Sequence, residues 1–270
     1  MNQKSDILTV ENLSISFSQY VKGLKTKKTT PINNLNISVR KGEIHAVIGA
    51  SGSGKSLLAH AILGILPANA ECRGEIYYQK KRLTEERKVQ LRGKEIAFIP
   101  QSVNYLDPLM RVGKQVKIGL PKKQANNIQE SLFERYGLKK TDAKLYPSEL
   151  SGGMLRRVLF ATSVKEDIKL VIADEPTPGI HPEALSRILN QLRQFADEGV
   201  SVMLITHDVV SALTICDRVT VFKDGEAIET TEAENFKGNG EGLLHPYTKA
   251  LWNCLPQNQF TLYKEVRSCR

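Results

Sequence analysis

The residues best suited to chemistry form a short glycine-rich stretch, GASGSGKS, at positions 49–56. Glycines let a backbone approach an anion closely, so that successive N–H groups can point at phosphate oxygens. Lys55 would bring a positive charge to the β- and γ-phosphates of a nucleotide, and the Ser56 hydroxyl could ligate Mg²⁺. The pattern GxxxxGK[ST] therefore predicts a triphosphate-binding loop, with a chance glycine-rich turn as the alternative. The residues expected to contact the nucleotide are Gly49, Ala50, Ser51, Gly52, Ser53, Gly54, Lys55, Ser56 and Leu57.

Two adjacent carboxylates follow a second apolar run, in KLVIADEPT at positions 169–177. Asp174 could hold Mg²⁺ through water, and Glu175 could orient and polarise an attacking water molecule. An ordinary acidic strand end is the alternative. It is disfavoured because open α/β sheets bind their ligands outside the carboxyl ends of their strands.

The elements around these residues predict how they are positioned. The run IHAVIG before the glycine-rich stretch is typical of a buried strand, and SLLAHAILGIL after it is typical of a helix. Further strands are expected in LVIAD, VSVMLIT and RVTVF, with an amphipathic helix in PEALSRILNQLRQFADEG. Alternating strands and helices predict an α/β core with parallel strands.

The remaining segments indicate how the chain is divided. Residues 7–17 alternate as strands around a turn, whereas the lysine-rich residues 18–34 are expected to be an exposed loop. Residues 103–165 have helical patterns and few β-branched runs, which predicts a helical insertion. FKGNGEG is expected to be a flexible linker before a C-terminal helix. We therefore expect one nucleotide-binding domain over residues 6–250, with its helical subdomain at about 103–165 and a short tail at 251–270.

Composition excludes several classes of protein. The 270 residues are 41% hydrophobic and 25% charged, without the ~18 consecutive apolar residues of a membrane helix and without a secretion signal, which predicts a cytosolic protein. The four cysteines form no CxxC pair and the five histidines lie far apart, so no metal site built from protein ligands alone is expected. The net charge of +9 would suit nucleic acid, but the lysines are dispersed and we expect no nucleic-acid partner.

Taken together, the motifs resemble those of ABC-type ATPases, the nucleotide-binding subunits of transporters. LSGGM at 150–154 is similar to the LSGGQ signature of that family, Gln101 to its Q-loop glutamine and His207 to its switch histidine. Phe17 matches the aromatic residue that stacks on adenine, with Tyr20 as the alternative. The resemblance runs from about residue 7 to 251. It implies the ABC ATPase fold: a P-loop core with a mixed sheet, an antiparallel β subdomain and a helical insertion.

The resemblance also implies roles and partners. Glu175, His207 and Gln101 would be catalytic, and Gln101 would join Ser56 and Asp174 around the Mg²⁺ of bound ATP. The signature turn would contact the ATP held by a second, homologous ATPase subunit, through Ser151, Gly152, Gly153 and Met154. The complete system would add two membrane permeases and an extracellular substrate-binding protein, which places this chain on the cytoplasmic face of the membrane as a peripheral subunit.

Two stretches resemble one branch of importers, for peptides and nickel: YLDPLMRVGKQV at 105–116 and HPYTKAL at 245–251. Only Cys254 and Cys269 lie beyond the second stretch, whereas peptide members often carry a cysteine-rich tail. This favours an importer of nickel, cobalt, zinc or a metal–chelator complex, with a dipeptide or oligopeptide importer as the alternative. LSGGM and IADEPT resemble the first of the two ATPases in such systems.

Two further expectations follow from the same resemblance. His181 stands where the family usually has the aspartate of its D-loop, which predicts that the two ATP sites of the complex are unequal. An apolar set in the insertion, Tyr105, Leu106 and Met110, is expected to line a groove for a permease helix, unless it forms the insertion's own core.

Two functions from other classes compete with a transporter subunit. A soluble ABC protein acting on nucleic acid or ribosomes would suit the basic charge, but such proteins usually join two ATPase units, and this chain has one set of motifs. A nucleotide-binding regulator without turnover is disfavoured because Glu175 and His207 are both present.

Overall fold

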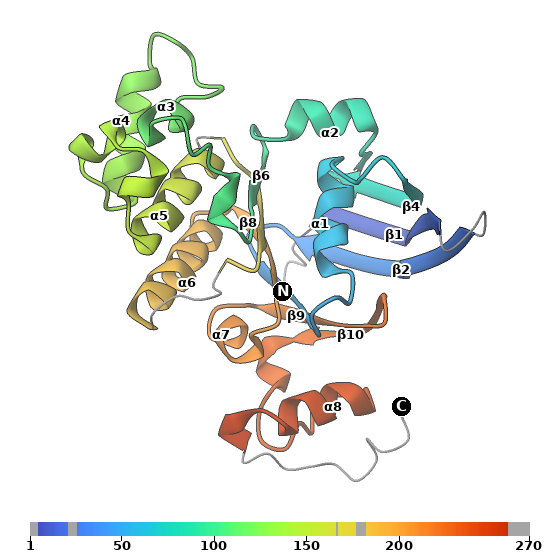
Figure 1. The fold of residues 1–270 in the computed structure, drawn as a ribbon. Coiled ribbons are helices and arrows are strands. Elements are labelled where there is room, and N and C mark those ends of the chain that lie inside the picture. The colour runs from blue at the N-terminus through green and yellow to red at the C-terminus, as the bar shows by residue number, and fades with distance from the viewer. Residues whose placement is uncertain (1–4, 21–25, 166, 177–181, 259–270) are drawn as a thin grey trace.

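A six-stranded sheet forms the centre of the fold in the computed structural model, which describes residues 5–20, 26–165, 167–176 and 182–258 (Figure 1). Its strand order is β10-β9-β3-β8-β7-β6, and all neighbours are parallel except β10 and β9. The strands are β3 (Ile44–Gly49), β6 (Ile96–Ile99), β7 (Leu170–Asp174), β8 (Ser201–Thr206), β9 (Arg218–Lys223) and β10 (Glu226–Glu232).

The central strands are apolar because both faces of the sheet are covered. Successive side chains alternate between the faces, so Val47 packs toward one side while Ala46 and Ile48 pack toward the other. Helix α1 (Lys55–Leu63) covers the Val47 face, and α6 (Pro182–Asp197) and α7 (Val209–Leu213) lie on the opposite side.

A second, antiparallel sheet packs against α1 from the outer side (Figure 1). Its order is β2-β1-β4-β5, formed by β1 (Asp6–Tyr20), β2 (Thr26–Arg40), β4 (Ala70–Tyr78) and β5 (Lys81–Arg82), and α2 (Glu85–Leu91) follows it. The prediction of an exposed loop over residues 18–34 is therefore wrong for the described residues of that stretch. Ser18 pairs with Lys28, and this pairing continues the long ladder of β1 and β2.

The segment from 103 to 163 is helical, as its patterns predict, and it stands apart from the antiparallel sheet in Figure 1. Leu106 is buried in the larger core cluster, so it belongs to the interior and not to an exposed apolar set, whereas Tyr105 is exposed and Met110 half-buried. The elements are η1 (Val103–Tyr105), α3 (Val112–Val116), α4 (Ala125–Arg135), η2 (Lys140–Lys144), η3 (Pro147–Glu149) and α5 (Gly152–Ser163).

The C-terminal segment packs on the rest of the chain. Helix α8 (Pro246–Asn253) spans the expected boundary at residue 250, and η4 (Ala233–Asn235) and η5 (Pro256–Asn258) flank it. Trp252 is buried, lies edge-on to Phe236 and donates its indole N–H to the Gly238 carbonyl at 3.0 Å. FKGNGEG is therefore held by side chains of α8 and is not a free linker. No helix within the described residues is long and apolar enough to cross a bilayer.

Candidate functional site

Three neighbouring strands end at one edge of the central sheet, and each leads into a predicted site residue. In the sheet, β8 lies between β3 and β7. The glycine-rich loop follows β3, Glu175 follows β7, and Thr206 and His207 lie where β8 ends. Since parallel strands present their carboxyl ends at one edge, segments more than a hundred residues apart in sequence are brought together there.

The glycine-rich loop has a conformation that requires glycine at two positions. Gly52 has a φ of 79° and Gly54 a φ of 101°, both in the left-handed region. A Cβ at Gly54 would also lie 2.5 Å from the Pro31 carbonyl oxygen, so no larger residue fits. Helix α1 begins immediately afterwards at Lys55, and its N-terminal N–H groups and positive dipole end face the loop. This arrangement fits a bound phosphate chain.

Lys55 curls back over the loop. Its ammonium donates to the carbonyl oxygens of Gly49 and Ala50, at 2.8 Å each, and lies 3.4 Å from the Ser53 hydroxyl. Burial lowers the pKa of Lys55, and the carboxylates of Glu175 and Asp174 oppose that shift. The side chain thus places a positive charge inside the curve of the loop.

Ser56 and Asp174 form a pair of oxygen ligands. The Ser56 hydroxyl donates to Asp174 Oδ1 at 3.1 Å, which joins the start of α1 to the end of β7. Burial raises the pKa of Asp174, and the neighbouring Glu175 charge adds to that effect, while the Ser56 hydrogen bond opposes it. A hydroxyl beside a carboxylate is the type of ligand that Mg²⁺ prefers, and a cation here would offset the cost of burying Asp174. The residues present therefore fit Mg²⁺.

Glu175 is fixed from three directions. Its φ is 44°, which is uncommon for a residue other than glycine, and its backbone N–H donates to the Ile205 carbonyl at 2.8 Å. The Thr206 hydroxyl donates to Oε2 at 3.1 Å, and His207 Nδ1 lies 2.7 Å from Oε1. The carboxylate is buried whereas the His207 side chain is 58% exposed, so the histidine lies between Glu175 and solvent.

Nine of the eighteen predicted site residues line one cavity of about 270 Å³. Gln101 enters it from the end of β6, and its backbone carbonyl accepts a hydrogen bond from Arg156 at 2.8 Å. The lining residues are Pro31, Ser51, Gly52, Gly54, Lys55, Ser56, Leu57, Gln101, Glu175 and His207. The arrangement places a glycine-rich loop, the Ser56 hydroxyl that is bonded to Asp174, and a carboxylate with a histidine around a single space.

Sequence reasoning did not find three residues that shape this site. Thr206 holds Glu175, Pro31 closes against the loop from β2, and Arg156 holds the backbone of Gln101. Only Thr206 carried a usable signal, because it is a hydroxyl residue at a strand end, directly before His207. The other two come from elements whose position relative to the loop is set by tertiary packing.

Other predicted contacts lie elsewhere. Phe17 is on β1, paired with Thr29 and Ala70, and is not among the lining residues of the cavity. The side chain of Tyr20, its alternative, lies outside the described part of the structure, and so does His181.

The signature turn also lies outside this cavity. The Ser151 hydroxyl caps α5 by accepting from the Met154 N–H at 3.3 Å. Ser151, Gly152 and Gly153 are all exposed, and a Cβ at either glycine would meet nothing within 4 Å. The start of α5 is therefore open to contact from outside the chain.

Comparison with known proteins assigns the family. The sequence profile of the ABC transporter family matches residues 32–178, more than half of the chain. The chain belongs to the ABC transporter family. It is 34% identical to the oligopeptide transport ATP-binding protein of Escherichia coli K12, over 94% of this chain and 77% of that protein. It is 31% identical to the dipeptide transport ATP-binding protein of Lactococcus lactis subsp. cremoris MG1363, over 93% and 74%.

Solved structures of the family share the fold. An ATP-binding cassette, solved as a dimer with ADP and phosphate, aligns with a TM-score of 0.72 and 22% identity, over 86% of this chain and 99% of that one. The predicted ABC ATPase fold is confirmed, and so is an ATP hydrolase coupled to transport. The expected preference for nickel or metal chelates gains no support, because the two relatives named above are peptide transport proteins.

Proposed function

We propose that this chain is the ATP-hydrolysing subunit of a peptide importer. The proposal depends on one observation: Thr206 and His207 both contact the Glu175 carboxylate, which lines the same cavity as Lys55 and the glycine-rich loop. The peptide cargo is supported by the names of the relatives, which act on oligopeptides and dipeptides and align over most of their own length. This is the alternative that the sequence left open beside a metal or metal–chelator cargo.

Binding of ATP would begin at the loop. Backbone N–H groups of residues 50–56 and the N-terminus of α1 would surround the phosphates, and the Lys55 ammonium would exchange its carbonyl acceptors for phosphate oxygens. Ser56, Asp174 and Gln101 would hold the metal ion. When bound, Mg²⁺ supplies neutralisation of the charge on the β- and γ-phosphates.

Hydrolysis would depend on Glu175. Its carboxylate would accept a hydrogen bond from a water molecule and orient it in line with the γ-phosphoryl group. Thr206 donates to one carboxylate oxygen, and His207 contacts the other. Because His207 is exposed and lines the cavity, it would move with bound nucleotide and sense the γ-phosphate.

The second half of the machine would come from partner subunits. The exposed helix start at Ser151, Gly152 and Gly153 would present N–H groups and a positive helix end to the ATP of a homologous ATPase subunit. Met154 continues that turn. Two permeases and an extracellular substrate-binding protein would complete the importer, with this chain attached to the cytoplasmic face of the membrane.

Exposed apolar side chains would attach the permease. Tyr105 is 63% exposed and Leu109 is 87% exposed, on consecutive turns after Gln101. Met110 is half-buried beside them. A short permease helix laid against these side chains would contact the segment that follows the cavity, so a change around bound ATP would reach the membrane through Gln101.

Reconstitution tests the proposal. The chain, its partner ATPase, the permeases and the binding protein are assembled in liposomes, and ATP hydrolysis and peptide uptake are measured. We expect peptide to stimulate hydrolysis, and Lys55→Ala to abolish both signals. Lys80→Ala removes an equal charge from an exposed turn and should change neither. Stimulation by a nickel–chelator complex and not by peptides would refute the peptide cargo.

A further inference from the structure

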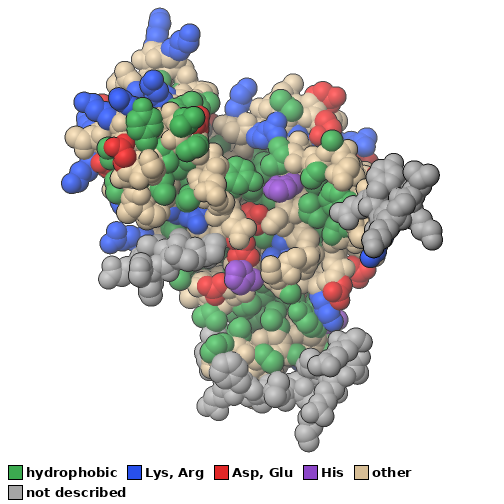
Figure 2. Space-filling view, viewed as in Figure 1, with side chains coloured by type: hydrophobic (Ala, Val, Ile, Leu, Met, Phe, Trp, Pro, Cys, Tyr) green, Lys and Arg blue, Asp and Glu red, His purple; other side chains and the backbone are tan. Residues whose placement is uncertain are grey.

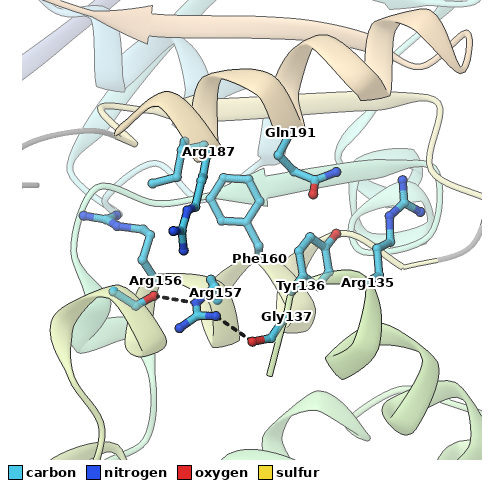
Figure 3. A pocket seen from close by; sticks show the side chains of 10 residues that line it. Arg135, Tyr136, Gly137, Arg156, Arg157, Phe160, Arg187 and Gln191 are labelled. Atoms are coloured by element: carbon cyan, nitrogen blue, oxygen red, sulfur yellow. Dashed lines mark hydrogen bonds between the residues drawn. The ribbon is translucent and has the colours of Figure 1, made fainter. Parts of the chain in front are cut away.

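A second cavity of about 270 Å³ lies between α4, α5 and α6, away from the nucleotide site (Figure 3). It shares no lining residue with the first cavity. Its walls are Arg135, Tyr136, Gly137, Gly153, Arg156, Arg157, Phe160, Arg187, Ile188 and Gln191. Four of these ten residues are arginines, and none is acidic.

The arginines differ in how their charges are balanced. Arg135 is paired with Glu198 at 2.7 Å. Arg156 and Arg157 donate only to backbone carbonyls, among the contacts that the structure describes. Arg187 is exposed and has no hydrogen-bond or ion-pair partner within the described residues. Three guanidinium groups therefore surround this space without a carboxylate.

Burial of Arg156 makes the lack of a neighbouring carboxylate energetically unfavourable. It is only 7% exposed, so its charge is removed from water. Carbonyl dipoles of Pro100 and Gln101 compensate it in part. A buried cation is stabilised far more by an anion than by dipoles alone, so the cavity favours a negative ligand.

The net charge of the surrounding segment also favours an anion. Residues 103–165 contain twelve basic and five acidic side chains, a net of +7 out of the chain's +9. Figure 2 shows the blue side chains concentrated over this region.

The floor of the cavity is apolar. Tyr136 and Phe160 are buried with ring centroids 6.1 Å apart, and Ile188 of α6 is buried next to them. Figure 3 shows Arg187 reaching down from α6 beside Phe160, and the Arg157 guanidinium below Phe160, hydrogen-bonded to the carbonyls of Gly153 and Gly137. Aromatic walls with guanidinium groups at the rim suit a ligand with an apolar body and an anionic head.

We propose that this cavity binds a small organic anion, a phosphate monoester or carboxylate carried on an apolar body. Its volume is just below the ~300–1,000 Å³ of most ligand sites, which limits the ligand to about the size of a substituted benzene. Arg157 and Arg187 form the two sides of the anion site. Two residues that line this cavity also contact residues predicted to act on ATP. Arg157 donates to the Gly153 carbonyl of the signature turn, and Arg156 donates to the Gln101 carbonyl. Occupancy of this site would thus reach both the signature turn and the Q-loop.

Calorimetric titration of the full chain tests the site. The nucleotide cavity is first saturated with a non-hydrolysable ATP analogue, and phenyl phosphate, benzoate, inorganic phosphate and phenol are then titrated in turn. We expect one saturable site for phenyl phosphate or benzoate, with weaker binding of inorganic phosphate and none of phenol. The tighter of the first two identifies the anionic group of the natural ligand.

Variants decide whether the binding belongs to this cavity. Arg187→Ala should weaken phenyl phosphate or benzoate about tenfold, because one charge-assisted contact is lost, and Arg187→Lys should weaken it less. Arg73→Ala removes an exposed arginine from β4 and should have no effect. Absence of saturable binding, or equal weakening by Arg187→Ala and Arg73→Ala, would overturn the proposal. Failure of the ATP analogue to bind would count against the proposed function alone.

Discussion

His207 Nδ1 lies 2.7 Å from Glu175 Oε1, and the Thr206 hydroxyl lies 3.1 Å from the other oxygen of the same carboxylate. The backbone of Glu175 is also held in a left-handed conformation by its hydrogen bond to Ile205. Such conformations persist where the surrounding structure enforces them, and they cluster at functional sites. The end of β7 and the end of β8 therefore act as one unit that aims Glu175 into the cavity.

Glu175→Gln should separate ATP binding from hydrolysis. Glutamine keeps the shape of the side chain but is a much weaker base, so we expect turnover to fall about 10²- to 10⁴-fold. The affinity for ATP should change little, because Lys55 and the loop are intact. Single-turnover hydrolysis and equilibrium binding measure the two effects in the assembled complex. Glu11→Gln, at an exposed position of strand β1, is the control, and unchanged turnover in Glu175→Gln would remove Glu175 from the mechanism.

Thr206→Val should lower kcat for ATP hydrolysis about tenfold and leave KM nearly unchanged. Valine has the same shape but cannot donate to Glu175 or accept the Asp208 N–H, so the carboxylate loses one of its two fixed oxygens. Thr206→Ser retains the hydroxyl and should restore most of the rate. Equal losses in the two variants would indicate that Thr206 contributes packing and not a hydrogen bond.

The sequence predicts the chemistry of this site better than its assembly. The apolar runs of β3, β7 and β8 and the glycines of the loop have strong local signals, because a strand buried on both faces must be apolar and positive φ favours glycine. The order of the strands has no local signal. That β8 lies between β3 and β7 depends on which strands pack together, and this order is what places Thr206 against Glu175.

For the lysine- and threonine-rich residues 26–30 a local signal exists, but it predicts the wrong structure. Their polarity predicts a loop, but they form the start of β2 because β1 offers a long partner, with Phe17 opposite Thr29. Strand preference depends on cross-strand neighbours more than on composition.

The role of Arg156 also could not be predicted from the sequence. Nothing in LSGGMLRRV distinguishes Arg156 from Arg157, yet Arg156 is the one that reaches the Gln101 carbonyl.

The buried His45 should make the fold sensitive to mild acid. His45 is fully buried between Thr220 Oγ1, at 2.7 Å, and Glu43 Oε1, at 3.4 Å. Burial lowers the pKa of His45, and its hydrogen bond with Glu43 opposes the shift. The unfolded chain therefore takes up a proton that the folded chain resists, and stability falls as pH drops below 6.5, by at most about 1.4 kcal/mol per pH unit.

Urea unfolding at pH 7.5 and pH 5.5 measures this loss. His45→Gln should reduce the difference between the two pH values, whereas His60→Gln, a half-buried residue of α1, should not. Glu43 contributes to the pH dependence of stability in a lower pH range, because its pKa is lowered. Burial would raise the pKa of Glu43, but the hydrogen bonds from His45 and Arg40 outweigh burial. Its contribution is lost below pH 4.5 and stays outside the measured window. The same pH difference in wild type and His45→Gln would contradict the prediction.

Tyr105→Asp should uncouple ATP hydrolysis from peptide uptake while the chain stays folded. Tyr105 is 63% exposed and touches Phe98 edge-on, so its loss costs little stability, about 1 kcal/mol. A charge at this position would prevent an apolar permease helix from packing beside Leu109. Uptake in liposomes, ATP binding and the melting temperature of the chain are measured together.

Two variants show whether the effect is specific to docking. Val89→Asp places the same charge on an equally exposed apolar residue of α2, 62% exposed, and should leave uptake normal. Leu106→Ala removes a buried side chain next to Tyr105 and should cost about 2–5 kcal/mol of stability, with a lower melting temperature. Normal uptake by Tyr105→Asp would show that this surface does not dock a permease, because coupling would be intact. A melting temperature of Tyr105→Asp as low as that of Leu106→Ala would also contradict the prediction, because Tyr105 would then be part of the core.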